Sequence, residues 1–141
     1  LHMNTLIGVL MGRVYKPLDF LSEGEIKKIL ESNEINEIIR LPLSVGQNYP
    51  NWKFAQDLCI KLSEYPDERV RVNAILGLSY IARTKRKLEK YIVKPVVLKA
   101  LKEQEEHKWR IINAIEDINL FMKWDIGKKA LVKENQQAQF D

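Results

Sequence analysis

The stretch YPDERVRVNAILGL, residues 65–78, decides the fold, because the chain contains a second version of it, QEEHKWRIINAIEDI, at residues 104–118. In both versions an acidic turn leads to an arginine and then to Asn-Ala-Ile. The separation is 39 residues from Asp67 to Glu106 and, after one inserted residue, 40 residues from Asn73 to Asn113. A period of this size is typical of helical units that stack on one another, because each unit buries its apolar face only against the next.

Apolar residues at helical spacing surround both versions. They recur from Trp52 to Leu62, and Asp67 then suits the N-cap of a new helix. A polar link over 84–94 follows, which is also compatible with the start of another helix, and Pro95 suits the first turn of a helix. The sequence therefore predicts two antiparallel helix pairs, one over 51–83 with its turn near Asp67, and one over about 95–124 with its turn at 105–107.

A degenerate third unit is predicted over residues 22–43. Ser22 and Glu25 form a capping box ahead of an apolar stripe, which favours a helix to about residue 32. Asn33 suits the N-cap of a second helix, and Pro42 is expected to end or bend that helix. No arginine falls in register with the other two units, so this unit is interpreted as one end of the stack.

The remaining segments are predicted as loops and ends of a single domain over residues 1–141. Residues 44–51 are expected to form a loop, and residues before 21 are compatible with a short helix or an extended segment. Leu1-His2 resembles an expression scar, and the polar residues from about 133 onward are expected to fray.

The composition indicates a soluble globular protein with a mildly basic surface. The net charge is +4 and the apolar fraction is 45%, which allows an acidic partner and a normal core. The single cysteine, Cys59, excludes an internal disulfide and is predicted to be a buried thiol. The apolar segment 5–11 is too short to cross a bilayer, which needs roughly 20 residues. A cytoplasmic protein without a membrane partner is therefore predicted.

Catalytic and cofactor signatures are missing from the sequence. One cysteine and two histidines, one of them in the expected scar, cannot supply a cysteine–histidine zinc set. His107 is interpreted as a solvated turn residue. Glu116 and Asp117 are adjacent on a helix and therefore point about 100° apart, so they do not form a converging acid pair. The prediction is a protein that is not an enzyme and that has no cofactor and no metal.

The doubled stretch resembles the HEAT repeat. Asp67-x-x-Val70-Arg71 followed by Ala74 matches its pattern, and Glu106-x-x-Trp109-Arg110 followed by Ala114 matches it more loosely. The resemblance implies an all-α fold, a short solenoid of paired antiparallel helices. It also implies that the acidic residue and the arginine brace neighbouring repeats, that the small residue lets helices approach, and that the second helix of each pair lines a concave side.

The outward stripes of the second helices are the predicted binding surface. On the helix over 68–83, Val70, Ala74, Leu78 and Ile81 form the core face, and the opposite side also carries Val72. On the last helix the opposite side also carries Ile112. The alternative is that flanking segments cover these stripes. The predicted partner-binding residues, which include two from the basic run over 83–90, are Asn73, Leu76, Tyr80, Arg83, Arg86, Lys87, Asn113, Glu116, Asn119, Leu120 and Lys123.

Three functions remain open for such a chain. It resembles HEAT-like members among small bacterial immunity and antitoxin proteins, which implies that it binds a cognate toxin domain and blocks its activity. The basic run favours nucleic-acid binding as an alternative, although basic residues are sparse along the stripes. A structural adaptor subunit is the third possibility. The leading hypothesis is a non-catalytic module whose partner is a protein.

Overall fold

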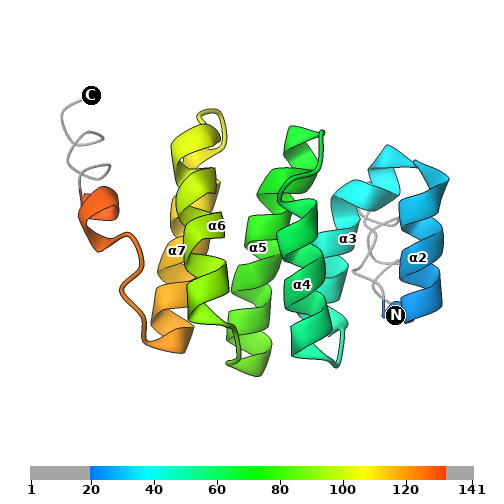
Figure 1. The fold of residues 1–141 in the computed structure, drawn as a ribbon, viewed down its shortest axis with the longest axis horizontal. Coiled ribbons are helices and arrows are strands. Elements are labelled where there is room, and N and C mark those ends of the chain that lie inside the picture. Colours follow the sequence, from blue (N-terminus) through cyan, green and yellow to red (C-terminus); the bar gives the residue numbers. More distant parts are fainter. Residues whose placement is uncertain (1–19, 133–141) are drawn as a thin grey trace, which may run out of the picture.

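The structure is a computed structural model that describes residues 20–132, and the fold is all-α, as predicted (Figure 1). The predictions for the first 19 residues and for the tail from residue 133 lie outside the described residues. A short turn of helix over 128–132 follows the last long helix. The six long helices of the described part are α2 Glu23–Ser32, α3 Ile35–Asn48, α4 Trp52–Leu62, α5 Glu68–Lys85, α6 Lys90–Glu103 and α7 Lys108–Met122.

The helices form two layers. Helices α3, α5 and α7 lie side by side, with α5 in contact with both of the others. Helix α4 packs on α3 and α5, and α6 packs on α5 and α7, while α2 packs on α3 (Figure 1). The predicted pairs are therefore α4 with α5 and α6 with α7, and the second helix of each pair belongs to the same layer.

The helix starts follow local capping signals. The Ser22 side chain accepts from the Glu25 N–H, and Glu25 accepts from the Ser22 N–H, so the predicted capping box is present. Asp67 caps α5 as predicted, through a bond from the Arg69 N–H at 2.8 Å. Asn33 does not cap α3. It ends α2 at φ 58°, a left-handed conformation that asparagine tolerates well, and Glu34 takes the N-cap position.

Pro42 does not end its helix, and Pro95 does not lie in the first turn of its helix as predicted. Helix α3 continues through Pro42 to Asn48, so most of the predicted loop is helical. Helix α6 begins at Lys90, which places Pro95 inside it. Pro95 has no N–H to donate to the Tyr91 carbonyl. Tyr91 is exposed, so water can donate to that carbonyl instead. Tertiary packing outweighs the local preference in both helices.

Two glycines allow a close contact between helices α3 and α5. A Cβ on Gly77 of α5 would lie 2.6 Å from the Pro42 carbonyl oxygen and 2.7 Å from the Cys59 Sγ. A Cβ on Gly46 of α3 would lie 2.5 Å from the Gly77 carbonyl oxygen. Ala74 is buried as expected, but Gly46 and Gly77 set the approach of α3 to α5.

Cys59 is a buried thiol, as predicted. Its Sγ lies 3.9 Å from the Pro42 carbonyl oxygen, and burial raises the pKa of the thiol to about 12. It is therefore a packing residue of the core. Among the described helices, none is both long enough and apolar enough to cross a membrane.

Candidate functional site

The α5–α7 face is the best candidate for a binding surface. We define it as Leu76, Tyr80 and Arg83 of α5 with Trp109, Asn113, Glu116, Asp117 and Leu120 of α7. Trp109 is 56% exposed and Leu120 is 68% exposed. Leu76 and Tyr80 are half-buried. Large exposed apolar side chains on one face, with polar residues between them, are the composition of protein interfaces.

The α7 part of this face is a straight strip. Trp109, Asn113, Asp117 and Leu120 follow one another at spacings of four, four and three residues, which places them on one side of a helix. In the doubled stretch Trp109 matches Val70, a core residue of α5, yet Trp109 is exposed. The α5 position 40 residues earlier is Arg69, which is exposed, so the repeat register puts residue 109 on the outside.

The α5 part of the face is fixed by internal contacts. The Arg83 guanidinium lies 4.7 Å from the centre of the Tyr80 ring. Its Nη2 also donates to the Gln47 Oε1 of α3 at 2.6 Å. Tyr80 and Arg83, both predicted partner-binding residues, are therefore held in one arrangement before any partner arrives, which lowers the entropy cost of binding.

Two predicted binding residues are engaged inside the chain. Asn73 is only 6% exposed, donates to the Ile39 carbonyl of α3 and accepts from the Arg110 Nη2 of α7, both at 2.8 Å. Asn119 donates to the Ile126 carbonyl at 3.0 Å and accepts from the Ile126 N–H at 2.9 Å. The amide of each side chain thus joins parts of the fold, a role that single-helix geometry did not reveal.

Val72 and Ile112 were placed on the outward stripes, and this was wrong because both are buried. Helix α5 has neighbours on both flanks of its layer and others beneath it, so little of its circumference faces outward. The free flank of α7 is covered by the segment after it, where Ile126 and Leu131 are buried. The outward face is narrower than the sequence predicted.

The brace implied by the HEAT resemblance is present only in part. Asp67 pairs with Arg69 at 2.8 Å, and that hydrogen bond lowers the pKa of the Asp67 carboxyl to about 2. Arg71 donates to the Tyr65 and Pro66 carbonyls of its own turn. Several bonds join the neighbouring pairs: Arg110 donates to Asn73, Gln56 donates to Glu89, and Arg71 Nε donates to the Gln104 amide oxygen once that amide is turned to suit its neighbours.

The basic run lies at the end of the layer where α5 and α7 terminate (Figure 1). Arg86 ends α5 at φ 55°, and its guanidinium lies 4.7 Å from the centre of the Phe121 ring. Lys123 ends α7 in the same left-handed conformation, at φ 58°. Lys87 and Lys123 are exposed, so they are the predicted basic residues that point freely into solvent. Cations are favourable at helix C-termini, which accounts for part of this cluster without a partner.

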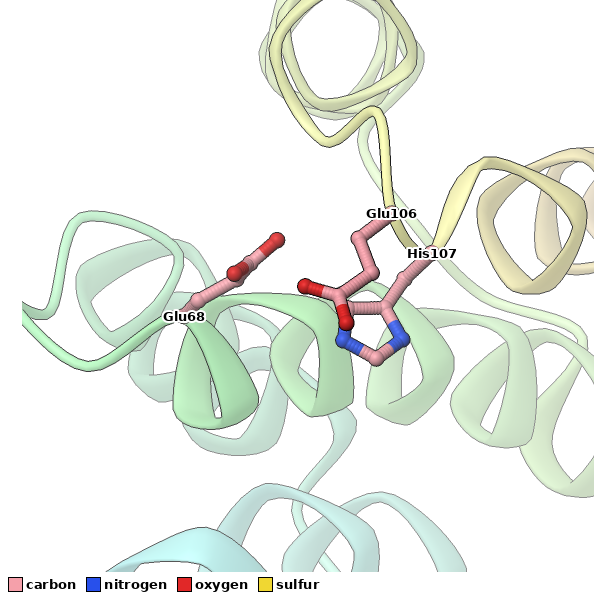
Figure 2. Close-up of side chains that lie close together, drawn as sticks. All are labelled: Glu68, Glu106 and His107. Atoms are coloured by element: carbon pink, nitrogen blue, oxygen red, sulfur yellow. The ribbon is translucent and has the colours of Figure 1, made fainter.

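Three possible metal ligands converge at the opposite ends of the same helices. Glu68 begins α5, and Glu106 and His107 form the turn before α7 (Figure 2). One ligand atom from each lies within 4.8 Å of the others. The numbers of cysteines and histidines exclude a zinc site built from those two residue types. They do not exclude a site built from carboxylates and one histidine. The sequence signal for this cluster is the repeat period. Glu68 and His107 are 39 residues apart, so they lie at matching ends of neighbouring helices.

A hollow of about 520 Å³ lies beside these ligands, between the turn before α5 and helix α6. Its lining residues include Tyr65, Arg71, Lys99 and Gln104. Its lining residues include no histidine and no cysteine.

Comparison with known proteins gives a structural likeness. No protein-family model matches the chain, and no curated protein matches it. The fold is similar to a chain in the crystal structure of a CDI complex from Cupriavidus taiwanensis LMG 19424, with a TM-score of 0.66 and 18% sequence identity. The similarity covers 76% of this chain and 96% of that chain. At this level of identity the likeness shows a shared fold.

Proposed function

We propose that this chain is a bacterial, cytoplasmic immunity protein that binds a toxin domain and blocks it without doing chemistry itself. The similar fold belongs to a chain of a CDI complex, and such contact-dependent inhibition systems include immunity proteins. We further propose that the helix pairs are HEAT-like repeats, because the doubled stretch fits that pattern. The α5–α7 face is the proposed interface.

The observation that carries this proposal is the strip of Trp109 and Leu120 on α7. Both are large, apolar and more than half exposed, and they lie on the same side of the helix. Tryptophan is enriched among the residues that dominate binding energy, and apolar anchors are effective when a partner buries them completely. Glu116 and Asp117 lie between the two anchors, and neither forms an ion pair with another described residue. A partner with basic groups between two apolar pockets fits this strip.

The basic end of the layer has a different proposed role. Lys87 and Lys123 are exposed at the rim, where charges change the rate of association more than the stability of a complex. Nucleic-acid binding is a second candidate because these residues gather at one end. We favour a protein partner, since Glu116 and Asp117 on the adjoining face would repel phosphates.

The test is binding to the toxin domain encoded beside this chain, measured by surface plasmon resonance after nuclease treatment. We expect Trp109→Ala and Leu120→Ala each to weaken binding by about 1–4 kcal/mol, with helicity by circular dichroism unchanged. Lys87→Glu with Lys123→Glu should slow association at low salt and leave dissociation nearly unchanged. In a toxin-protection assay in cells, the variants with weaker binding should protect less.

The matched control is Tyr91→Ala on α6, because Tyr91 is 92% exposed but lies in the other layer. It should bind like the original chain. Full affinity in both α7 variants would contradict the proposed interface. Recovery of nucleic acid alone, lost at high salt, would favour the second candidate, and a stable complex with a protein that has no toxic activity would favour a structural adaptor.

A further inference from the structure

We propose that Glu68, Glu106 and His107 bind a divalent transition-metal ion, which joins the turn before α7 to the first turn of α5. This proposal is independent of the proposed function and of the α5–α7 face. It concerns the end of the layer opposite the basic run.

The three ligands come from two different helix pairs. Glu68 lies in the first turn of α5, whereas Glu106 and His107 belong to the turn that precedes α7. Their ligand atoms lie within 4.8 Å of one another, and the side chains converge on the same space (Figure 2). An ion bound there would therefore add a connection between two helix pairs that already contact each other through α5 with α7 and through α5 with α6.

The chemistry of the ligands selects a class of ion. Two carboxylates and one imidazole suit zinc and neighbouring first-row divalent ions, with water completing the coordination. Calcium and magnesium prefer oxygen ligands alone, so the imidazole disfavours them. Glu106 is exposed and gives the ion a path from solvent, while Glu68 and His107 are half-buried.

The His107 side chain is not used by the fold in the usual way. It occupies the N-cap position of α7, where a side chain commonly accepts from the first helical N–H groups, but it makes no such bond. Asp67, at the corresponding position of α5, does make that bond. The imidazole is therefore not engaged in capping its own helix.

The Glu68 carboxylate is oriented from behind by a buried amide. Gln104 is only 5% exposed. With its amide turned to suit its neighbours, its nitrogen donates to the Glu68 Oε1 at 3.2 Å and its oxygen accepts from the Arg71 Nε at 3.3 Å. Such outer partners fix the direction of metal-binding carboxylates and are a regular part of metal sites.

The charge balance also favours a cation. Within residues 20–132, neither Glu68 nor Glu106 forms an ion pair with a lysine or arginine. Two carboxylates held close together repel each other unless a proton or a cation lies between them. A divalent ion would remove this repulsion and bring its own binding energy to the contact between the two pairs.

The test is isothermal titration calorimetry of the full chain with zinc chloride after treatment with a chelator. We expect one saturable site, weakened at least about tenfold by His107→Ala and by Glu68→Gln. The chain has two histidines, so His2→Ala is the matched control and should bind zinc like the original chain. Zinc should also raise the melting temperature of the original chain and leave that of His107→Ala unchanged.

The isosteric change Glu68→Gln keeps the test informative if His107→Ala disturbs the turn. The proposal fails if the original chain shows no saturable binding of one zinc ion. It also fails if both ligand variants bind like the original chain, or if His2→Ala abolishes binding.

Discussion

The two versions of the repeated stretch perform different tasks although their core residues agree. At a register of 40 residues, Ile75 matches Ile115 and Leu78 matches Ile118, and all four are buried. The outward residues behave differently. Asn73 is buried between its neighbours, whereas its counterpart Asn113 is exposed.

The difference follows from position in the stack. Helix α5 has α3 on one side and α7 on the other, so its sides serve packing. Helix α7 has a long helix on one side only, and its outward strip is wider and carries Trp109 and Leu120. The repeated sequence thus determines where the helices form and which residues are buried. The position of each copy in the layer determines whether its outward residues remain available for binding.

The largest expected difference between the copies is at Gly77 and its counterpart Asp117. In Gly77→Ala the new Cβ would meet the Pro42 carbonyl at 2.6 Å, and backbone cannot move aside cheaply. We expect a loss of about 1–3 kcal/mol of unfolding free energy, measured by urea denaturation. Asp117→Ala, at an exposed position, should change it by less than about 0.5 kcal/mol. Equal losses at the two positions would break the comparison.

A smaller difference is expected at the asparagines. Asn73→Ala removes the bonds to the Ile39 carbonyl and to the Arg110 guanidinium, which leaves a partly buried contact between three helices unsatisfied. The expected loss is about 1–2 kcal/mol in the same denaturation experiment. Asn113→Ala serves as the control and should stay within about 0.5 kcal/mol of the original chain. If Asn113→Ala lost as much unfolding free energy as Asn73→Ala, the two asparagines would both be structural, and the proposed difference between the copies would be wrong.

The smallest expected difference concerns acid. The hydrogen bond from Arg69 lowers the pKa of Asp67 to about 2, below its ordinary 3.8. Because the folded pKa is depressed, the stabilisation is complete above about pH 4 and is lost as the pH falls through about 2. Asp67→Asn should therefore lose less stability than the original chain between about pH 5 and about pH 2.5, as measured by thermal melting.

Glu25 and Glu89 also have lowered pKa values, caused mainly by hydrogen bonds to Ser22 and Lys53. Both are present in the original chain and in the variant, so the comparison isolates Asp67. Identical pH profiles for the two proteins would show that this cap does not contribute to acid sensitivity. The second copy, which has His107 at the cap, should not substitute for it.

Local signals in the sequence predicted much of the fold. The capping box at Ser22 and the cap at Asp67 depend on residues within three positions, so the chain's own order reveals them. The helical period likewise identified the core face of α5. The effects of Pro42 and Pro95 could not be predicted in this way, because they depend on the packing and the solvent around each helix and not on the neighbouring residues in sequence.

The candidate site was harder to predict because it depends on register and on distant contacts. With a period of 39 residues Trp109 aligns with the buried Val70, whereas with a period of 40 residues it aligns with the exposed Arg69. Asn73 contacts residues 34 and 37 positions away in sequence, and such bonds leave no local signature. Leu120, by contrast, was placed on the outward side correctly, since the spacing within α7 was enough to orient it.

The segment after α7 has a consequence for how the protein exists in solution. A row of side-by-side helices has no natural end, and its last member could offer an apolar flank to the first helix of another molecule. Asn119 grips the backbone at Ile126, and the Gly127 backbone then comes close to Leu98 of α6, so close that a Cβ there would be 3.1 Å from it. Two hydrogen bonds to one residue thus hold the start of this segment to α7, where its Ile126 is buried.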